Sequence, residues 1–421
     1  MTNGGDDHAP LPATLATASG TQIGDSGGSG RTRMQGTELS AAATGVNAAD
    51  VACMRHVYAG ELLPDALVNA FRSPTQAFAT RLVRRGGAAT RLPAGKAPRN
   101  PVIIRTQDGN FDLFDYVSRN RVAGLLVLKD GRIALEEYQF GNDAATHWLS
   151  MSMAKSIATT LVGAAILEGH VRSVDELITA YLPELSGSGY DGVSIRHVLQ
   201  MTSGVRWDDT HTEPASERRA MLELQLAQQP GAIMRYIAGR PRVAAPGTAW
   251  NYSTGETHIV GALLRAATGR WLSDYLSERV WARVGMESDA TWWLESPGGL
   301  EVAGSGFGAT LRDYGRFGLF VMNDGIIDGT RILPEGWMRE ASAPRQVGGS
   351  QVEYGYMWWP VADRGGSFAE GAYSARGIFG QYMYVNPVQR VVIVVWSARS
   401  KPKGAEAIAD NDFFNAMVAA L

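Results

Sequence analysis

The stretch Ser152-Met153-Ala154-Lys155 opens an apolar helical pattern that runs to about Glu168. Ser152 and Lys155 are three residues apart, which places them on one face of a helix, close enough to interact. Apolar residues continue the pattern at helical spacing, and a stop signal follows it, at Ile157, Leu161, Val162, Ala165, Ile166 and Gly169. The sequence therefore predicts a helix whose first turn presents a serine beside a lysine.

This pair of side chains suits nucleophilic chemistry. A serine hydroxyl is a poor nucleophile unless a base lies beside it. A lysine acts as that base only after it loses its proton, and complete burial lowers a lysine pKa by up to about 3–5 units. The residues after Lys155 are mostly apolar, and the first turn of a helix directs backbone N–H groups toward the serine oxygen. The alternative is a capped helix that carries a solvated lysine.

Two later segments favour the chemical interpretation. In Trp250-Asn251-Tyr252-Ser253-Thr254, the tyrosine precedes an apolar helical run and can relay the proton of the lysine. Residues 375–381 contain glycines that let a backbone approach a ligand closely, and they enter a predicted strand. The N–H of Ile378 is expected to join that of Ser152 as an oxyanion hole. The alternatives are a tyrosine packed between lobes and an ordinary bulge at a strand start.

Strand patterns lie at both ends of the chain. Residues 122–128 and 132–138 are β-rich runs around Lys129-Asp130-Gly131, which predicts a hairpin. Residues 378–385 and 391–397 are predicted to form two adjacent strands.

Helices are predicted between and after these strands. The range Thr310 to Met322 is predicted to be a helix capped by Thr310, with Asp313 in the capping-box position. A closing helix is expected at about 404–420, and residues 173–304 are mostly helical in pattern.

The order of these patterns predicts an α/β fold of the α+β type. An antiparallel sheet flanked by helices is assembled from residues 51–172 and 305–421, and a mainly helical domain, residues 173–304, is inserted. Residues 1–50 lack an apolar period and are predicted to be a disordered tail. Gly24-Asp25-Ser26-Gly27-Gly28 within that tail matches a serine-hydrolase motif. No strand precedes it, so it receives no catalytic role.

Composition excludes several classes of function. The 421-residue chain has a net charge of −3 and no basic run, so nucleic acid is not an expected partner. The single cysteine, Cys53, and scattered histidines predict neither a disulfide framework nor a metal site. No apolar run has membrane-spanning length, and the N-terminus lacks the pattern of a secretory signal. A cytoplasmic protein that does not bind membranes is therefore expected.

The motifs, taken in this order, resemble the serine β-lactamase and penicillin-binding protein superfamily. Within it the chain is most similar to the branch of class C-related esterases and 6-aminohexanoate-dimer (nylon-oligomer) hydrolases. The resemblance extends from about residue 55 to the end. It includes residues 181–185, residues 197–204 and the segment Tyr354-Gly355-Tyr356-Met357-Trp358-Trp359.

The resemblance implies a β-lactamase/transpeptidase-like fold with its active site between the two domains and no cofactor. Ser152 would be the nucleophile, Lys155 its general base and Tyr252 the group that passes a proton to the leaving group. The backbone N–H groups of Ser152 and Ile378 would bind the oxyanion. The expected partner is a small-molecule ester or amide, cleaved through an acyl-enzyme, and a homodimer is an alternative to a monomer.

Departures from the family pattern bear on the substrate. Thr254 replaces the asparagine of β-lactam binders, and Ala375 stands at the position of their lysine, with Arg376 as the nearest cation. His211 stands where the nylon-oligomer branch has an assisting tyrosine, and Leu222 where an aspartate binds the substrate amine. Ester cleavage is therefore preferred to cleavage of a cationic amide. An amide hydrolase of the 6-aminohexanoate type and a non-catalytic binding protein are the alternatives.

Further residues are expected to contact the substrate. They are His211, Thr254, Trp207, Arg376 and Gly377. Tryptophans near the expected cleft would form aromatic walls that favour apolar acyl or alcohol groups, with core packing as the alternative. These are Trp207, Trp250, Trp292, Trp293, Trp358 and Trp359.

Overall fold

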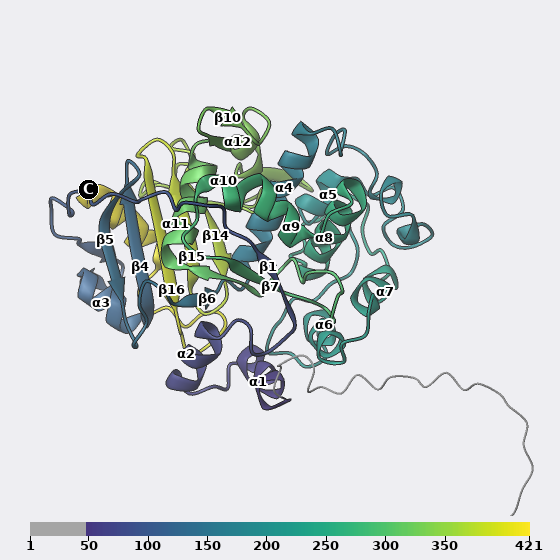
Figure 1. Ribbon diagram of the computed structural model, residues 1–421, viewed down its shortest axis with the longest axis horizontal. Helices are drawn as coiled ribbons and strands as arrows, with labels where there is room; N and C mark the ends of the chain where they lie inside the picture. Colours follow the sequence, from purple (N-terminus) through teal and green to yellow (C-terminus); the bar gives the residue numbers. More distant parts are fainter. Residues whose placement is uncertain (1–47) are drawn as a thin grey trace, which may run out of the picture. The chain divides into compact units, whose positions relative to one another are not determined.

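The computed structural model describes residues 48–421 (Figure 1). The Gly24–Gly28 motif lies outside the described residues, as does the expected tail up to residue 47. The strands are β1 (Thr80–Val83), β2 (Ile104–Thr106), β3 (Gly109–Phe111), β4 (Val122–Lys129), β5 (Arg132–Tyr138), β6 (His147–Leu149), β7 (Ala290–Trp293), β8 (Phe307–Thr310), β9 (Ile326–Ile327), β10 (Thr330–Arg331), β11 (Arg345–Val347), β12 (Ser350–Val352), β13 (Trp359–Pro360), β14 (Tyr373–Gly377), β15 (Gln381–Asn386) and β16 (Val391–Ser397).

The α-helices lie mostly between β6 and β13. They are α1 (Ala48–Ala59), α2 (Pro64–Arg72), α3 (Leu113–Arg119), α4 (Met153–Leu167), α5 (Ile195–Leu199), α6 (Glu217–Leu226), α7 (Ala232–Ala238), α8 (Thr254–Thr268), α9 (Leu272–Leu276), α10 (Ala282–Val284), α11 (Leu311–Met322), α12 (Trp337–Ala341) and α13 (Asp410–Ala420). None of the helices between Ala48 and Leu421 has the length and apolar character that a membrane crossing requires.

The predicted hairpin is confirmed. Strands β4 and β5 pair antiparallel, with Lys129 opposite Arg132. Asp130 and Gly131 both have positive φ, 50° and 74°, which is the backbone of a tight turn whose twist matches that of the flanking strands.

The main sheet joins strands from both ends of the chain. Its order is β13-β14-β15-β16-β4-β5, and every neighbouring pair is antiparallel. The β16–β4 pairing sets Ile393 opposite Val127, and Figure 1 shows the yellow β16 beside the blue β4. This antiparallel sheet flanked by helices confirms the predicted fold class.

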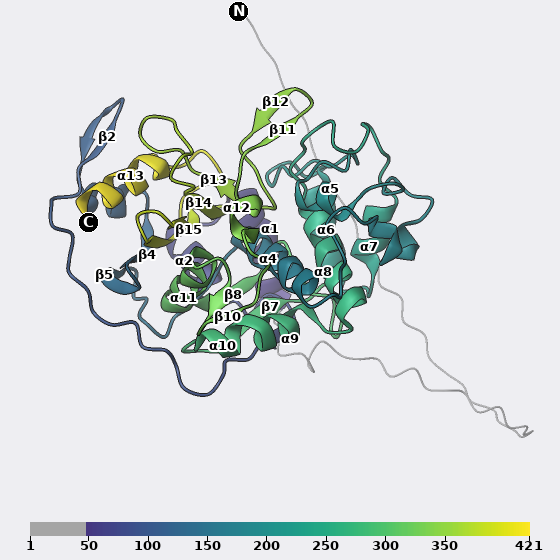
Figure 2. The same ribbon diagram turned by 90° about the horizontal axis from the view of Figure 1, so that it is seen from above.

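Helices cover both faces of this sheet. Leu126 and Leu128 pack in the core on the α11 side, whereas Leu125 and Val127 pack in the core that contains Phe413 of α13. Successive strand residues point to opposite faces, and Figure 2 shows α11 and α13 on opposite sides of the sheet. Because both faces are buried, these strands read as continuous apolar runs.

A second sheet, of order β1-β7-β8-β6, positions the serine segment. Strand β6 ends at Leu149, and Ser150 N donates to Phe307 O over 2.8 Å just before Ser152. Strand β7 lies inside the range expected to be mainly helical. The contacts of the chain group the described residues 48–421 within one unit, so the division at residues 172 and 304 stays a prediction. Figures 1 and 2 both show α4 between the main sheet and helices α5 to α8.

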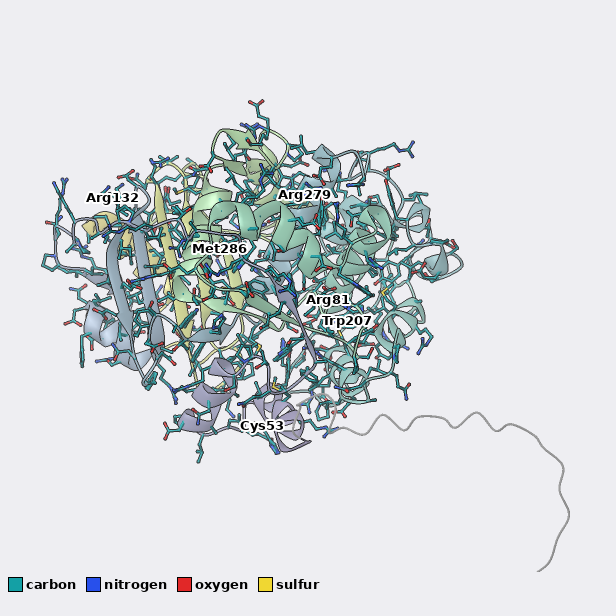
Figure 3. All side chains as sticks on the ribbon, viewed as in Figure 1. Cys53, Arg81, Arg132, Trp207, Arg279 and Met286 are labelled. Atoms are coloured by element: carbon teal, nitrogen blue, oxygen red, sulfur yellow. The ribbon has the colours of Figure 1, made fainter. Side chains whose placement is uncertain are left out.

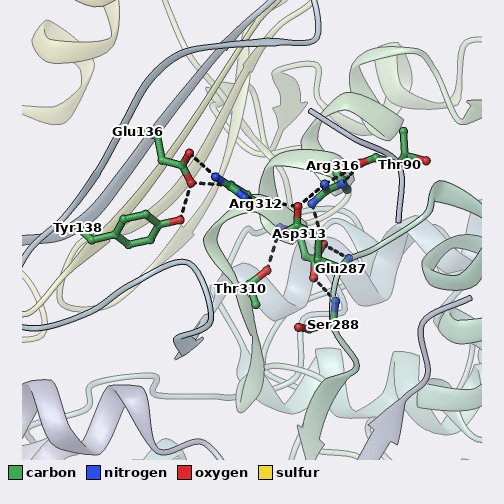
Figure 4. A network of polar contacts seen from close by, with 9 residues as sticks. All are labelled: Thr90, Glu136, Tyr138, Glu287, Ser288, Thr310, Arg312, Asp313 and Arg316. Atoms are coloured by element: carbon green, nitrogen blue, oxygen red, sulfur yellow. Dashed lines mark hydrogen bonds and ion pairs between the residues drawn. The ribbon is translucent and has the colours of Figure 1, made fainter. Parts of the chain in front are cut away.

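The predicted cap of α11 is present, but its reciprocal half is not. Asp313 N donates to the Thr310 hydroxyl over 3.2 Å. The Asp313 carboxylate instead accepts from Glu287 N over 2.8 Å and pairs with Arg316 at 3.1 Å (Figure 4). The acid at the capping-box position therefore fastens α11 to the segment before β7.

Two boundaries differ from the sequence prediction. The strand expected from residue 378 begins at Gln381, because Phe379 and Gly380 have φ of 65° and 87° and form the turn between β14 and β15. Ile378 therefore lies at the tip of a hairpin. The closing helix, expected from about residue 404, begins at Asp410 after a loop that contains Lys401-Pro402-Lys403-Gly404. The N–H groups of Ala407 and Ile408 both donate to Asn120 Oδ1, over 2.9 and 3.0 Å, which holds the residues before Asp410 in this loop.

Candidate active site

Ser152 and Lys155 meet at the start of α4. Lys155 Nζ donates to Ser152 Oγ over 3.0 Å and to Gly304 O over 2.9 Å. The Ser152 side chain makes no capping bond to the helix, although the residue occupies the N-cap position. Lys155 is only 1% exposed. The alternative of a capped helix with a solvated lysine is therefore wrong.

Burial changes the acid–base character of Lys155. It lowers the pKa of this lysine to about 7, although the carboxylate of Asp209 acts in the opposite direction. A burial penalty disfavours the charged form of an amine that has lost its water. At neutral pH a large share of Lys155 is consequently neutral and able to accept the proton of Ser152.

Tyr252 lies close to this pair, at the corner before α8. Lys155 Nζ is 5.2 Å from the centroid of the Tyr252 ring. Burial raises the pKa of Tyr252 and the charge of Asp209 raises it further, while hydrogen bonding with Ser152 lowers it in part. The phenol therefore stays protonated at neutral pH and is able to donate a proton.

The N-cap of α8 fixes this corner. Glu256 N donates to the Ser253 hydroxyl over 3.2 Å, directly after Tyr252. The adjacent Thr254 donates its N–H to Asp209 Oδ2 over 2.6 Å and its hydroxyl to Oδ1 over 3.1 Å. Trp207 Nε1 donates to the same carboxylate over 2.7 Å. Asp209 therefore holds the start of α8 in place beside the lysine.

The buried carboxylate of Asp209 also acts on Lys155 through its negative charge. Burial alone would raise its pKa, but surrounding positive groups, led by Lys155, hold that pKa below its ordinary value. The carboxylate stays ionised and works against the complete loss of the proton from Lys155. No motif in the sequence singles out Asp209, because it reaches Lys155 only through tertiary packing.

Within residues 48–421, two residues that line one cavity, Ser152 and Ile378, have backbone N–H groups without a protein acceptor. A Cβ at Gly377 would lie 2.4 Å from Ser150 O and 3.1 Å from Met151 Cβ. Only glycine lets the end of β14 approach the serine segment this closely, which brings Ile378 toward Ser152. Met151, just before the serine, has a φ of 46°, an uncommon conformation for a residue with a side chain.

These groups line a cavity of about 340 Å³. Ser152 and Tyr252 line it, together with the aromatic side chains of Trp250 and Trp359. The Tyr252 and Trp359 rings stack with centroids 6.0 Å apart. Other lining residues come from the end of β14 and from the loop before α13, namely Arg376, Gly377, Ile378, Lys401 and Lys403.

His211 lines the cavity and is held from two sides. Its ring stacks on Tyr58 with centroids 5.6 Å apart, and its Nε2 lies 3.9 Å from Asp209 Oδ1. Burial lowers the pKa of His211 to about 3, against the effect of Asp209. The histidine is therefore neutral at physiological pH. Tyr58 of α1, which the sequence did not single out, supports it and accepts a hydrogen bond from the buried Arg218.

Other expected contact residues have different places. The cavity lining does not include Trp207 or Thr254, which instead bind Asp209 beneath the start of α8. Figure 3 labels Trp207 on the side of the molecule where helices α6 to α8 lie. Of the six tryptophans that are expected from the sequence to lie at the cleft, only Trp250 and Trp359 line the cavity, whereas Trp292, Trp293 and Trp358 are buried in the core.

Comparison with known proteins identifies the family. The protein-family model described as Beta-lactamase matches residues 113–415. The chain belongs to the beta-lactamase family. The range includes the segments that carry Ser152, Lys155, Tyr252 and Ile378, and this beta-lactamase-family protein is a serine hydrolase.

Relatives show which hydrolases it resembles. It is 28% identical over 358 residues to the 6-aminohexanoate-dimer hydrolase of Paenarthrobacter ureafaciens, which covers 82% of this chain and 84% of that protein. Its fold matches a Bacillus anthracis protein assigned as a 6-aminohexanoate-dimer hydrolase, with a TM-score of 0.72, 21% identity, and 91% and 98% of the two chains covered. A family VIII carboxylesterase matches with a TM-score of 0.56, 17% identity and coverage of 73% and 95%.

Proposed function

We propose that this serine hydrolase cleaves a carboxylic ester of a small to medium substrate through an acyl-enzyme on Ser152. The observation that carries the proposal is the 3.0 Å contact of Ser152 Oγ with a fully buried lysine whose pKa is about 7. Lys155 accepts the hydroxyl proton as Ser152 Oγ forms a bond to the substrate carbonyl carbon. The N–H groups of Ser152 and Ile378 then donate to the oxyanion.

Collapse of the tetrahedral intermediate breaks the bond to the leaving group. Tyr252 donates its phenolic proton to the departing oxygen and regains a proton from Lys155, which restores both groups. Water then attacks the acyl-enzyme by the same route, and the free acid leaves with Ser152 reprotonated. The sequence assigns no cofactor to this reaction, and the only expected partner is the small-molecule substrate. A cytoplasmic location and the choice between monomer and homodimer stay predictions.

Amide hydrolysis of the 6-aminohexanoate type is the second candidate. It is favoured by the 28% identity to the Paenarthrobacter ureafaciens 6-aminohexanoate-dimer hydrolase. Leu222 is fully buried in the core and supplies no negative charge for a substrate amine. An ester also has the better leaving group, so ester cleavage is placed first.

The nucleophile is tested with p-nitrophenyl acetate and butyrate. We expect turnover by the wild-type protein and a loss of at least about a thousandfold in Ser152→Ala, because the covalent route is removed. Intact mass after a fluorophosphonate probe should show one adduct that Ser152→Ala lacks. Ser118→Ala, which removes an exposed hydroxyl on α3, should behave as wild type. Full activity or unchanged labelling in Ser152→Ala would contradict Ser152 as the nucleophile.

A further inference from the structure

His211 lines the cavity, but no hydrogen bond fixes the orientation of its ring. Its backbone is held by α6, because Arg219 Nη1 donates to His211 O over 3.2 Å. Its Nε2 lies 3.9 Å from Asp209 Oδ1, which is beyond hydrogen-bonding distance. Within residues 48–421, neither ring nitrogen makes a hydrogen bond to the protein. The orientation of the ring therefore depends on the groups that pack against it.

Tyr58 of α1 supplies the ring that stacks on His211. The two ring planes differ by only 4°, and their centroids are 5.6 Å apart. Stacked rings with centroids about 4.5–7 Å apart attract each other. Both side chains are buried, with 1% of Tyr58 and 5% of His211 exposed. A tilt of the imidazole would break this parallel contact, so Tyr58 restricts the His211 ring to one plane.

Arg218 of α6 holds Tyr58 in turn. Its guanidinium donates to the Tyr58 hydroxyl, and its Cζ lies 4.3 Å from the centroid of the Tyr58 ring. Arg218 is 2% exposed, and in the described part of the chain it pairs with no carboxylate. A buried guanidinium without such a pair loses much if its hydrogen-bond partner is removed. Figures 1 and 2 both show α1 beside α6, so the Tyr58 ring is placed independently of His211.

The end of α1 also contacts a second part of the cavity lining. Gly60 O accepts a hydrogen bond from Lys401 Nζ over 2.8 Å, and a Cβ at Gly60 would lie 2.8 Å from Pro402 Cδ. Lys401 and Pro402 line the cavity, as His211 does. This helix therefore joins two cavity-lining segments that are distant in the sequence. It lies outside residues 113–415, so the match to the family model does not account for this arrangement.

The orientation of His211 decides what the ring offers to a substrate. Burial keeps the imidazole neutral at physiological pH, so one ring nitrogen carries a hydrogen to donate and the other accepts. A group that lines an active site contributes to the reaction only in an orientation that meets the substrate. Building on the proposed acyl-enzyme function, we propose that Tyr58 is a positioning residue that holds the His211 ring in the orientation in which it contacts the substrate.

Substitutions of Tyr58 test this role with p-nitrophenyl butyrate. Tyr58→Leu should lower kcat/KM by about tenfold, because the His211 ring loses its stacking partner. Tyr58→Phe retains the stacked ring and should recover most of that loss. The rate of fluorophosphonate labelling should stay within about twofold of wild type in both variants, because the contact of Lys155 with Ser152 remains in place.

A double-mutant cycle assigns the effect to His211. His211→Ala should itself lower kcat/KM by about tenfold. Adding Tyr58→Leu to it should change kcat/KM by less than about twofold, since a positioning residue has no effect once the group that it positions is gone. Tyr58→Met, whose flexible side chain fills irregular gaps, replaces Tyr58→Leu in the cycle if that variant does not fold.

Tyr275→Leu is the matched control. Tyr275 is also buried, and its hydroxyl donates to Glu168 Oε2 over 2.7 Å, but it does not line the cavity. Loss of this second buried tyrosine should leave kcat/KM per folded molecule as in wild type. A tenfold loss in Tyr275→Leu as well would show that removal of any buried tyrosine lowers activity, and the inference would fall.

Other outcomes separate this inference from the proposed function. A wild-type kcat/KM in Tyr58→Leu, or a further tenfold loss when it is added to His211→Ala, would show that Tyr58 does not act through His211. Equal losses in Tyr58→Phe and Tyr58→Leu would assign the effect to the hydroxyl and also overturn the inference. Each of these results leaves Ser152-dependent turnover standing. No turnover of any ester by the folded wild-type protein refutes the proposed function, and this inference with it.

Discussion

At the scale of single residues, the site depends on one lysine held close to its neutral form. Burial lowers the pKa of Lys155 from 10.5 to about 7. The base is active only when unprotonated, so kcat/KM should rise as the pH increases through about 7. With one titrating base, the rate at pH 6 should be about tenfold below that at pH 8. An ester assay read at the isosbestic wavelength of the product measures this rise of kcat/KM with pH. A kcat/KM that stays constant from pH 6 to 8 would contradict the assignment of Lys155 as the base.

Titration of Glu256 would produce a similar limb, a rise of kcat/KM near pH 7, and must be distinguished from titration of Lys155. Glu256 lies four residues after Tyr252, and burial raises its pKa to about 8. Glu256→Gln removes this titration and retains an oxygen that can accept the hydrogen bond from the Ser203 hydroxyl. The limb near pH 7 should persist in this variant if Lys155 produces it. Its disappearance would assign the limb to Glu256 instead.

At the scale of elements, the approach of β14 to the start of α4 is the critical distance. A Cβ at Gly377 would meet the backbone Ser150 O at 2.4 Å, and Gln381 Cβ and Met151 Cβ at 3.0 and 3.1 Å leave little room to relax. Gly377→Ala should therefore displace the Ile378 N–H and lower kcat by about a hundredfold or more, the usual effect of losing one oxyanion donor. Gly87→Ala, where no atom lies within 4 Å, is the matched control.

Circular dichroism and fluorophosphonate labelling complete that test. Gly377→Ala should keep the wild-type spectrum and still present Ser152, because the change affects oxyanion binding more than the nucleophile. Wild-type kcat in Gly377→Ala would show that the close approach has no catalytic role.

Elements set by local signals were predicted well from the sequence. The Asp130-Gly131 turn and the Ser152–Glu168 helix depend on neighbouring residues, and both occur as expected. The turn at residues 378–380 was missed because Ile378-Phe379 continues the apolar pattern of the strand, and only the positive φ of Phe379 ends it. Asp209 and Lys403 reach the site through tertiary packing, for which spacing along the chain gives no signal.

At the scale of the whole molecule, charged pairs fasten distant segments around α11. Arg316 is 2% exposed and pairs with Asp313 and Glu287, while Arg312 on the same helix pairs with Glu136 of β5 (Figure 4). The buried Arg316–Asp313 pair needs both members, because removal of one leaves the other charge buried and unpaired. The main sheet, α11 and the segment before β7 are therefore held in one arrangement by a network outside the cavity.

This network predicts a loss of stability that does not affect catalysis. Arg316→Met should lower the free energy of unfolding by about 3–5 kcal/mol, measured by urea denaturation. Arg55→Met breaks the exposed Arg55–Glu223 pair, in which both side chains are 47% exposed, and should cost at most about 1 kcal/mol. Turnover per folded molecule should match wild type in both variants, since neither arginine lines the cavity. Equal losses of stability in the two variants would show that burial of the Arg316 pair adds nothing to the stability of the fold.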